Sequence, residues 1–251
     1  MNSFRNLLEL KEYKDTTLLL YYLPKYTVLV YPPRWGKTVN LSMAYYFYNI
    51  ENTTENKELF RNLKISSTEE FLKLQGKFNV LWLDFKTIKK KEDFYSMLHM
   101  YVTKYNIKPN KYNPDLKALP IPFLLEYIVD QVYVNTGLKT VVLIDNYNYP
   151  AEIDPYLANL INSIFHFLQN NNKIYKVIAV GDKILKNVAG TTNFITEDIL
   201  TKNYNKYFYV EDTVTNVNNH IGIQIPEEEF NFFDIARRHW TSTAKGTEFI
   251  I

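Results

Sequence analysis

Apolar residues in this sequence gather into short runs that alternate with segments of helical spacing. Five runs are predicted to form strands because they are short, rich in β-branched and aromatic residues, and bounded by turn-forming residues. They cover residues 27–31, 78–85, 140–145, 174–180 and, with a weaker pattern, 207–210. The run at 140–145 is apolar at nearly every position before Asp145, which is typical of a strand buried on both faces of a parallel sheet.

Between these runs, apolar positions recur every three or four residues, which predicts amphipathic helices. The expected helices are 18–23 with Asp15 as its N-cap, one from Gly36-Lys37-Thr38 to about Ile50, 59–65, 94–105, 123–134 ending near Gly137, 155–168 and 227–240. Residues 1–13, 51–58 and 108–122 are expected to be irregular connections. Because strands alternate with helices, the predicted class is α/β, with a five-stranded, mostly parallel sheet flanked by helices.

The connection between the first strand and its helix has the strongest chemical signal. It reads Tyr31-Pro32-Pro33-Arg34-Trp35-Gly36-Lys37-Thr38, which gives the order strand, loop, Gly-Lys-Thr, helix. This is the layout of a phosphate-binding P-loop, in which backbone N–H groups and the helix N-terminus face the phosphates. Gly36 would allow close approach, Lys37 would reach the β and γ phosphates, and Thr38 would bind Mg²⁺ through its hydroxyl. Tyr31 replaces the first glycine of the full pattern, so an ordinary turn with a solvated lysine is the alternative interpretation.

A second part of such a site is predicted at the end of the 140–145 strand. P-loop proteins place a carboxylate on a neighbouring strand, where it helps to hold Mg²⁺. Asp145 ends an apolar strand, and ligands of open α/β sheets bind at the carboxyl ends of the strands. The alternative is a strand that merely ends at a polar residue. The order of elements predicts the P-loop subtype with an additional strand between the P-loop strand and the Asp145 strand.

Asn146 occupies the position at which many ATPases of this subtype have a glutamate that polarises the attacking water. An amide cannot accept a proton, so a general-base role is lost, although Asn146 could still orient a water. The expectation is nucleotide binding with weakened or absent hydrolysis. Two other hypotheses stay open: an active ATPase that uses Asn146, Asp84 or a partner's group to place water, and a scaffold on the same fold that needs no nucleotide.

Composition narrows the class of protein. The net charge is +2 over 251 residues, which by itself indicates no strong attraction to nucleic acid or anionic lipid. The chain has no cysteine, so disulfides and Cys-ligated metals are excluded. We see no leader peptide and no membrane-spanning run, and expect an intracellular protein, cytoplasmic or nuclear, without a membrane partner. A protein partner, contact of nucleic acid with the lysines at 86–91, and the oligomeric state stay open.

The assembled motifs resemble the AAA-ATPase-like family, whose members usually carry a PD-(D/E)XK nuclease-type domain after the P-loop domain. The similarity rests on Tyr13-Lys14-Asp15-Thr16-Thr17, Tyr31–Thr38, Leu59–Ile65, Ile144-Asp145-Asn146-Tyr147-Asn148, Gly181 and an eroded Phe208–Asp212. No nuclease-type domain is recognised downstream, so no nuclease role is expected. The D-x-K shape of Asp84-Phe85-Lys86 is more consistent with a place at the edge of the P-loop sheet.

The resemblance implies a P-loop domain at residues 1–214, a C-terminal helical extension at 215–251, and ATP and Mg²⁺ as cofactors. The expected nucleotide-binding residues are Pro33, Arg34, Trp35, Gly36, Lys37 and Thr38. Thr38 and Asp145 are the expected metal-binding residues, and Asn146 takes the catalytic position. Arg237 and Arg238 on the last helix are more consistent with a solvent-facing pair than with an arginine that reaches the γ-phosphate.

Overall fold

The computed structural model describes residues 4–10, 15–30, 36–112, 114–183 and 185, and the backbone of 195–198. Five parallel strands form one sheet in the order β2-β3-β4-β1-β5. Their bounds are β1 Tyr26–Val30, β2 Asn79–Asp84, β3 Thr140–Asp145, β4 Ile174–Gly181 and β5 Ile195–Asp198. The α/β class and the parallel sheet are confirmed, and β4 is the additional strand between the P-loop strand β1 and the Asp145 strand β3.

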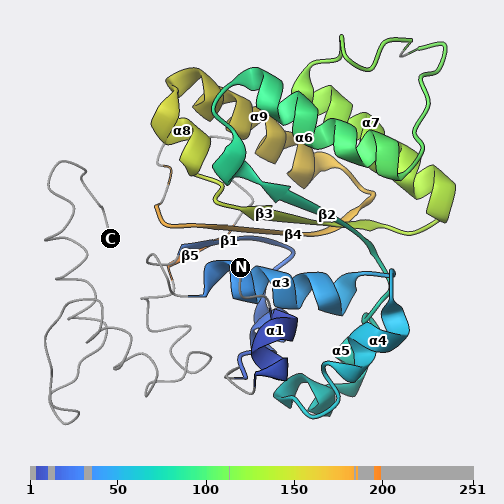
Figure 1. Cartoon of the computed structure of the whole chain (residues 1–251), viewed down its shortest axis with the longest axis vertical. Helices are drawn as coiled ribbons and strands as arrows, with labels where there is room; N and C mark the ends of the chain where they lie inside the picture. The colour runs from blue at the N-terminus through green and yellow to red at the C-terminus, as the bar shows by residue number, and fades with distance from the viewer. Residues whose placement is uncertain are drawn as a thin grey trace, which may run out of the picture.

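Helices cover both faces of the sheet (Figure 1). The longer ones are α3 Lys37–Tyr48, α6 Lys91–Lys104, α7 Ile121–Thr136 and α9 Pro155–Asn170. The shorter ones are α1 Phe4–Glu9, α2 Leu18–Tyr22, α4 Thr53–Glu58, α5 Glu69–Leu72, α8 Tyr149–Ile153 and the 3₁₀ turns η1 Lys64–Ser67 and η2 Phe85–Thr87. In Figure 1, α6, α7 and α9 lie on one side of the sheet and α1, α3, α4 and α5 on the other.

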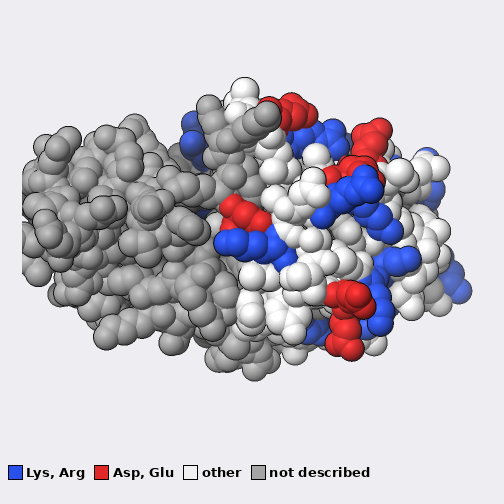
Figure 2. Space-filling model, turned by 90° about the horizontal axis from the view of Figure 1, so that it is seen from below, with Lys and Arg blue, Asp and Glu red and all other residues white. Residues whose placement is uncertain are grey.

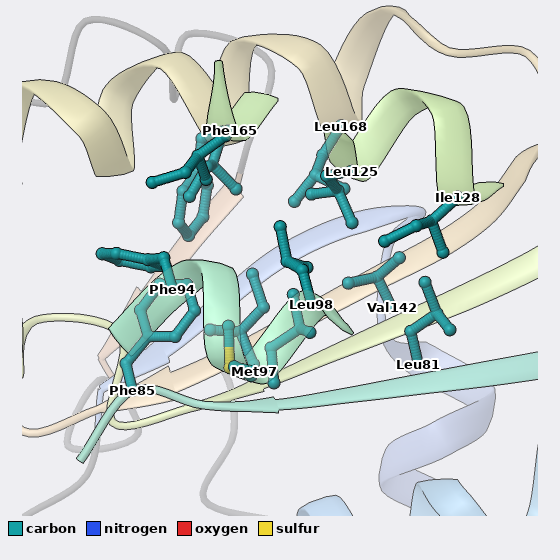
Figure 3. Packing of buried hydrophobic residues seen from close by; sticks show 14 of the residues in the cluster. Leu81, Phe85, Phe94, Met97, Leu98, Leu125, Ile128, Val142, Phe165 and Leu168 are labelled. Atoms are coloured by element: carbon teal, nitrogen blue, oxygen red, sulfur yellow. The ribbon is translucent and has the colours of Figure 1, made fainter. Parts of the chain in front are cut away.

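Alternate residues of each strand supply the two halves of the core, because successive side chains of a strand point to opposite faces. Val142 and Ile144 of β3 pack with the residues of α6, α7 and α9, whereas Val141 and Leu143 pack with those of α1 and α3. Figure 3 shows the first half, in which Phe94, Leu125 and Phe165 approach the sheet from three different helices. Burial on both faces explains why these strands are continuous apolar runs rather than alternating ones.

Several predicted elements need correction. The predicted helix 59–65 is wrong: the helix lies earlier, at α4, and residues 59–63 form turns that bury Phe60. The lead-in contains α1, whose Phe4 is fully buried and stacks on Phe60 with ring centroids 5.0 Å apart. Thr17, not Asp15, is the N-cap of α2. Asp15 precedes the N-cap by two residues, and its Oδ1 accepts a hydrogen bond from the Thr17 backbone N–H at 2.9 Å.

The fifth strand of the described sheet is β5, which pairs with β1 and was not predicted. The predicted strand 207–210, the predicted helix 227–240 and the predicted extension 215–251 lie outside the described residues. The pairing of β5 with β1 is a long-range interaction that local hydropathy did not reveal. Gly137 does end α7, in the left-handed conformation with φ 71°.

Charges of both signs share the described surface. On the face shown in Figure 2, the described Lys and Arg side chains are interspersed with Asp and Glu. Examples from α1 and α4 are Arg5 and Glu55, whose charged atoms are 3.8 Å apart. This mixture agrees with the near-balanced net charge of +2. Among the described residues, no helix combines the length and the apolar character needed to cross a membrane.

Candidate functional site at the carboxyl edge of the sheet

The parallel strands end at a common edge, and the register of the sheet decides which residues meet there. Asp84 at the end of β2 lies opposite Asp145 at the end of β3, and Asp145 lies opposite Val180 of β4. Val30 at the end of β1 lies opposite Gly181. Carboxylates from two strands therefore share one edge with the end of β1.

Helix α3 begins at this edge, directly after a position whose backbone conformation favours glycine. Gly36 is left-handed with φ 77° and ψ 17°, a conformation that residues with a Cβ rarely adopt. Apart from its chain neighbours, no described residue has an atom within 4 Å of the position that a Cβ would occupy, so the backbone conformation favours glycine there. Lys37 and Thr38 follow as the first residues of α3, at the helix end where backbone N–H groups have no intrahelical acceptor and the helix dipole favours anions.

Thr38 and Asp145 are in direct contact across the site. The Thr38 hydroxyl donates to Oδ2 of Asp145 at 2.8 Å, although 107 residues separate them in sequence. Asp145 is 1 % exposed, and its other oxygen, Oδ1, is buried without a hydrogen bond from the described residues. Burial raises the pKa of Asp145, the Thr38 hydrogen bond opposes that rise, and the negative charge of Asp84 adds to it.

The ammonium group of Lys37 is influenced by carboxylates at the ends of two strands. Burial lowers the pKa of its ammonium group, and the negative charges of Asp182 and then Asp145 oppose that effect. Sequence reasoning assigned no role to Asp182. The signal that identified Asp145, a carboxylate at the end of an apolar strand, could also have identified Asp182, which directly follows β4.

Asn146 occupies a backbone position that suits asparagine. Its φ is 56°, in the left-handed region that asparagine enters more readily than most residues. Its side-chain Nδ2 donates to Oδ1 of Asp84 at 3.0 Å, and the backbone N–H of Lys86 donates to the same oxygen at 2.9 Å. Asp84 is half-buried at the edge beside Asp145, as the sequence predicted.

Asn148 joins the ends of β3 and β4. Its Nδ2 donates to Oδ1 of Asp182 at 2.6 Å and to Oε1 of Glu152 at 2.6 Å, and its Oδ1 accepts the Asp182 backbone N–H at 3.1 Å. Gly181 leaves room for this arrangement, since a Cβ there would lie 2.3 Å from Asn148 Oδ1 and 2.5 Å from the Tyr147 ring. The sequence analysis had given Gly181 as a family-like glycine after a strand, without this packing role.

The arrangement fits a divalent cation and a polyphosphate. Oδ1 of buried Asp145, which accepts no hydrogen bond from the described residues, and the hydroxyl of Thr38 are oxygen donors of the kind that Mg²⁺ prefers. Lys37 and the start of α3 supply positive charge for phosphate oxygens. Pro33, Arg34 and Trp35, the other expected nucleotide-binding residues, lie outside the described residues, as do Arg237 and Arg238. Among the residues that the structure describes, no three His, Asp or Glu side chains form a separate metal cluster.

Comparison with known proteins agrees with this geometry. The model of the AAA-ATPase-like family, described as a predicted AAA-ATPase, matches residues 1–200 of the 251 in the chain. No curated protein matches the sequence. The match spans β1, the Gly-Lys-Thr segment, the Asp145 strand and all the described elements up to β5. The chain therefore belongs to the AAA-ATPase-like family of predicted AAA-ATPases.

Proposed function

We propose that this protein binds Mg·ATP at the carboxyl edge of the sheet and that hydrolysis there is weak or lost. The observation that carries the proposal is the 2.8 Å hydrogen bond from the Thr38 hydroxyl to buried Asp145, with the second Asp145 oxygen left without a hydrogen bond from the described residues. A buried carboxylate oxygen without a partner is costly unless a ligand satisfies it. A divalent cation would do so.

The roles of the neighbouring residues follow from their charges and positions. Lys37 would contact the β and γ phosphates from the first position of α3, while backbone N–H groups at the helix start would bind phosphate oxygens. Thr38 and Asp145 would hold Mg²⁺, directly or through water. When bound, Mg²⁺ neutralises phosphate charge and orients the terminal phosphate. Pro33, Arg34 and Trp35 complete the proposed nucleotide-binding segment, and membership of a predicted AAA-ATPase family supports ATP as the nucleotide.

Slow hydrolysis is proposed because position 146 holds an amide. Its Nδ2 is already engaged with Asp84, and neither atom of the amide can remove a proton from water. Loss of a general base typically lowers the rate about 10²–10⁴-fold. Nucleotide binding would persist because Asn146 is outside the proposed phosphate and metal contacts.

The first experiment measures the shift in melting temperature caused by ATP with Mg²⁺ and by ATP with EDTA. A ligand that binds only the folded state must stabilise it, by about 2.7 kcal/mol at a concentration of 100 Kd. We expect a clear shift with Mg²⁺, a smaller one with EDTA, and no shift in Lys37→Ala. Lys104→Ala is the matched control, because Lys104 forms a surface ion pair with Glu51 at 2.8 Å at the far end of α6.

The outcomes separate the three hypotheses. No shift in the wild-type protein would refute nucleotide binding and favour the nucleotide-independent scaffold. A shift combined with rapid phosphate release would favour the active ATPase. A comparison of phosphate release by wild type and Asn146→Glu tests the missing base directly, with an added strain of about 1–2 kcal/mol expected for glutamate in the left-handed conformation.

A further inference from the structure

Among the residues whose side chains the structure describes, four carboxylates lie at or near the carboxyl edge of the sheet, and three of them already have an electrostatic partner or a proposed ligand. Asp145 accepts from Thr38 and is a proposed metal ligand. Asp182 is the strongest negative influence on Lys37 and accepts from Asn148. Glu152 pairs with Lys183 at 3.3 Å. Each of these three side chains is therefore already engaged by a contact or by a proposed ligand.

Asp84 is different. Among the described residues, no Lys or Arg forms an ion pair with it. Both of its side-chain hydrogen bonds, from Asn146 Nδ2 at 3.0 Å and from the Lys86 backbone N–H at 2.9 Å, fall on Oδ1. In the described part of the chain, Oδ2 therefore accepts no bond, and Asp84 is exposed enough to meet water.

The end of β2 also lies at the edge of the sheet that carries the proposed phosphate site. Asp84 is the register partner of Asp145, one strand away. Burial lowers the Lys37 pKa, and the positive charge of Lys86, two residues beyond Asp84, adds a smaller lowering effect. The bond from Asn146 ties Asp84 to the position at which a glutamate is missing.

We propose that Asp84 is the carboxylate that accepts the proton of the attacking water, and that Asn146 is the residue that positions it. The carboxylate of this pair then lies on β2 and the amide after β3. This inference rests on the proposed function, and it assigns the hydrolysis that remains to one residue.

The reaction balances without any further reactant. The water oxygen forms a bond to the γ-phosphorus while the bond from that phosphorus to the β–γ bridging oxygen breaks, so ADP leaves with the bond's electron pair. Oδ2 of Asp84 takes one proton from the water and later releases it to solvent or phosphate. Asn146 takes no part in proton transfer: its N–H fixes Oδ1 and so turns Oδ2 toward the water.

The test combines two readouts on the full chain: calorimetric Kd for Mg·ATP and single-turnover phosphate release. Asp84→Asn removes the charge at constant shape, and we expect its hydrolysis rate to fall about 10²–10⁴-fold with a Kd within about twofold of wild type. Glu92→Gln, an exposed carboxylate in the first turn of α6, is the control and should change neither quantity.

The exchange variant Asp84→Asn/Asn146→Asp distinguishes catalysis from structural support. It keeps one amide and one carboxylate in contact, and aspartate tolerates the left-handed conformation of position 146. We expect it to recover at least about tenfold of the rate lost in Asp84→Asn, as expected when a general base is restored. Asn146→Ala should lower kcat with little change in KM, because it removes the hydrogen bond that positions Asp84 and no proposed contact with the nucleotide.

Each contrary result has a distinct meaning. An unchanged rate in Asp84→Asn, or a wild-type protein that binds Mg·ATP and shows no hydrolysis at all, would overturn the assignment of Asp84 and leave the proposed function intact. A large loss of Mg·ATP affinity in Asp84→Asn would also overturn it, since Asp84 would then be a binding residue. Absence of Mg·ATP binding by the wild type would refute the proposed function itself.

Discussion

Replacing Lys176 by methionine should stabilise the protein at neutral pH. Lys176 lies on β4 among buried residues and is 6 % exposed. Burial lowers the pKa of its ammonium group to about 8. Its Nζ donates to the backbone oxygen of Leu23 at 2.6 Å, and the described residues offer it no carboxylate. Methionine has a similar length and no charge to desolvate.

The magnitude follows from the difference between the folded and unfolded pKa values. A fall from 10.5 to about 8 corresponds to about 3 kcal/mol at ~1.4 kcal/mol per pKa unit. Loss of the hydrogen bond to Leu23 offsets about 1 kcal/mol. The net expectation is a gain of about 2 kcal/mol at pH 7, or roughly 4–8 °C in melting temperature for a chain of this size.

The sign of the pH dependence is fixed by proton uptake. Between about pH 8 and pH 10.5 the unfolded wild type binds more protons at position 176 than the folded protein, so wild-type stability rises with pH in that window. Below pH 8 both states are protonated and the penalty is fully present. The advantage of Lys176→Met should therefore be constant from pH 6 to about pH 8 and shrink above it.

Urea unfolding at several pH values, with Lys25→Met as an exposed-lysine control, measures this difference. Position 176 is five residues before Gly181, about 16 Å from the carboxyl edge, so the shift caused by Mg·ATP should not change. A Lys176→Met protein that is less stable at pH 7, or a difference that is constant up to pH 10, would refute the argument.

Three further predictions concern the site and its supporting strands. Gly181→Ala should lower stability by about 1–3 kcal/mol and weaken Mg·ATP binding, because the new methyl overlaps Tyr147 and Asn148; unfolding and calorimetry measure both, and unchanged values would contradict the crowding. Asp145→Asn should abolish the Mg²⁺-dependent thermal shift yet raise the melting temperature in EDTA at pH 7. Burial raises the pKa of Asp145, so ionised Asp145 lowers the stability of the folded protein at pH values above that raised pKa. The stability gained by Asp145→Asn should therefore disappear as the pH falls through the raised pKa. A gain that persists in acid would contradict this reasoning. Tyr101→Phe should cost about 1–3 kcal/mol, because the hydroxyl accepts the Trp82 backbone N–H of edge strand β2 at 2.7 Å and donates to the Trp82 oxygen; a neutral substitution would mean that water replaces it.

Much of the fold could be predicted because its signals are local. The first four strands were recognised from continuous apolar runs, and α7 and α9 from spacings of three and four residues. Gly36 and Gly137 were placed correctly because each ends or begins a helix in the left-handed conformation. The failures were short elements such as α1 and α4, whose helicity depends on packing partners such as Phe60 rather than on their own propensity.

The sequence by itself determined the chemical groups at the strand ends, because strand ends, glycine turns and helix starts are each recognised from a few consecutive residues. It therefore placed Lys37, Thr38 and Asp145 on one edge. Only the tertiary structure decided which groups touch: Asp84 with Asn146 across 62 residues, and Asn148 with Asp182 across 34. Such pairings depend on strand order and register, which arise from the burial of the whole sheet and not from any one segment.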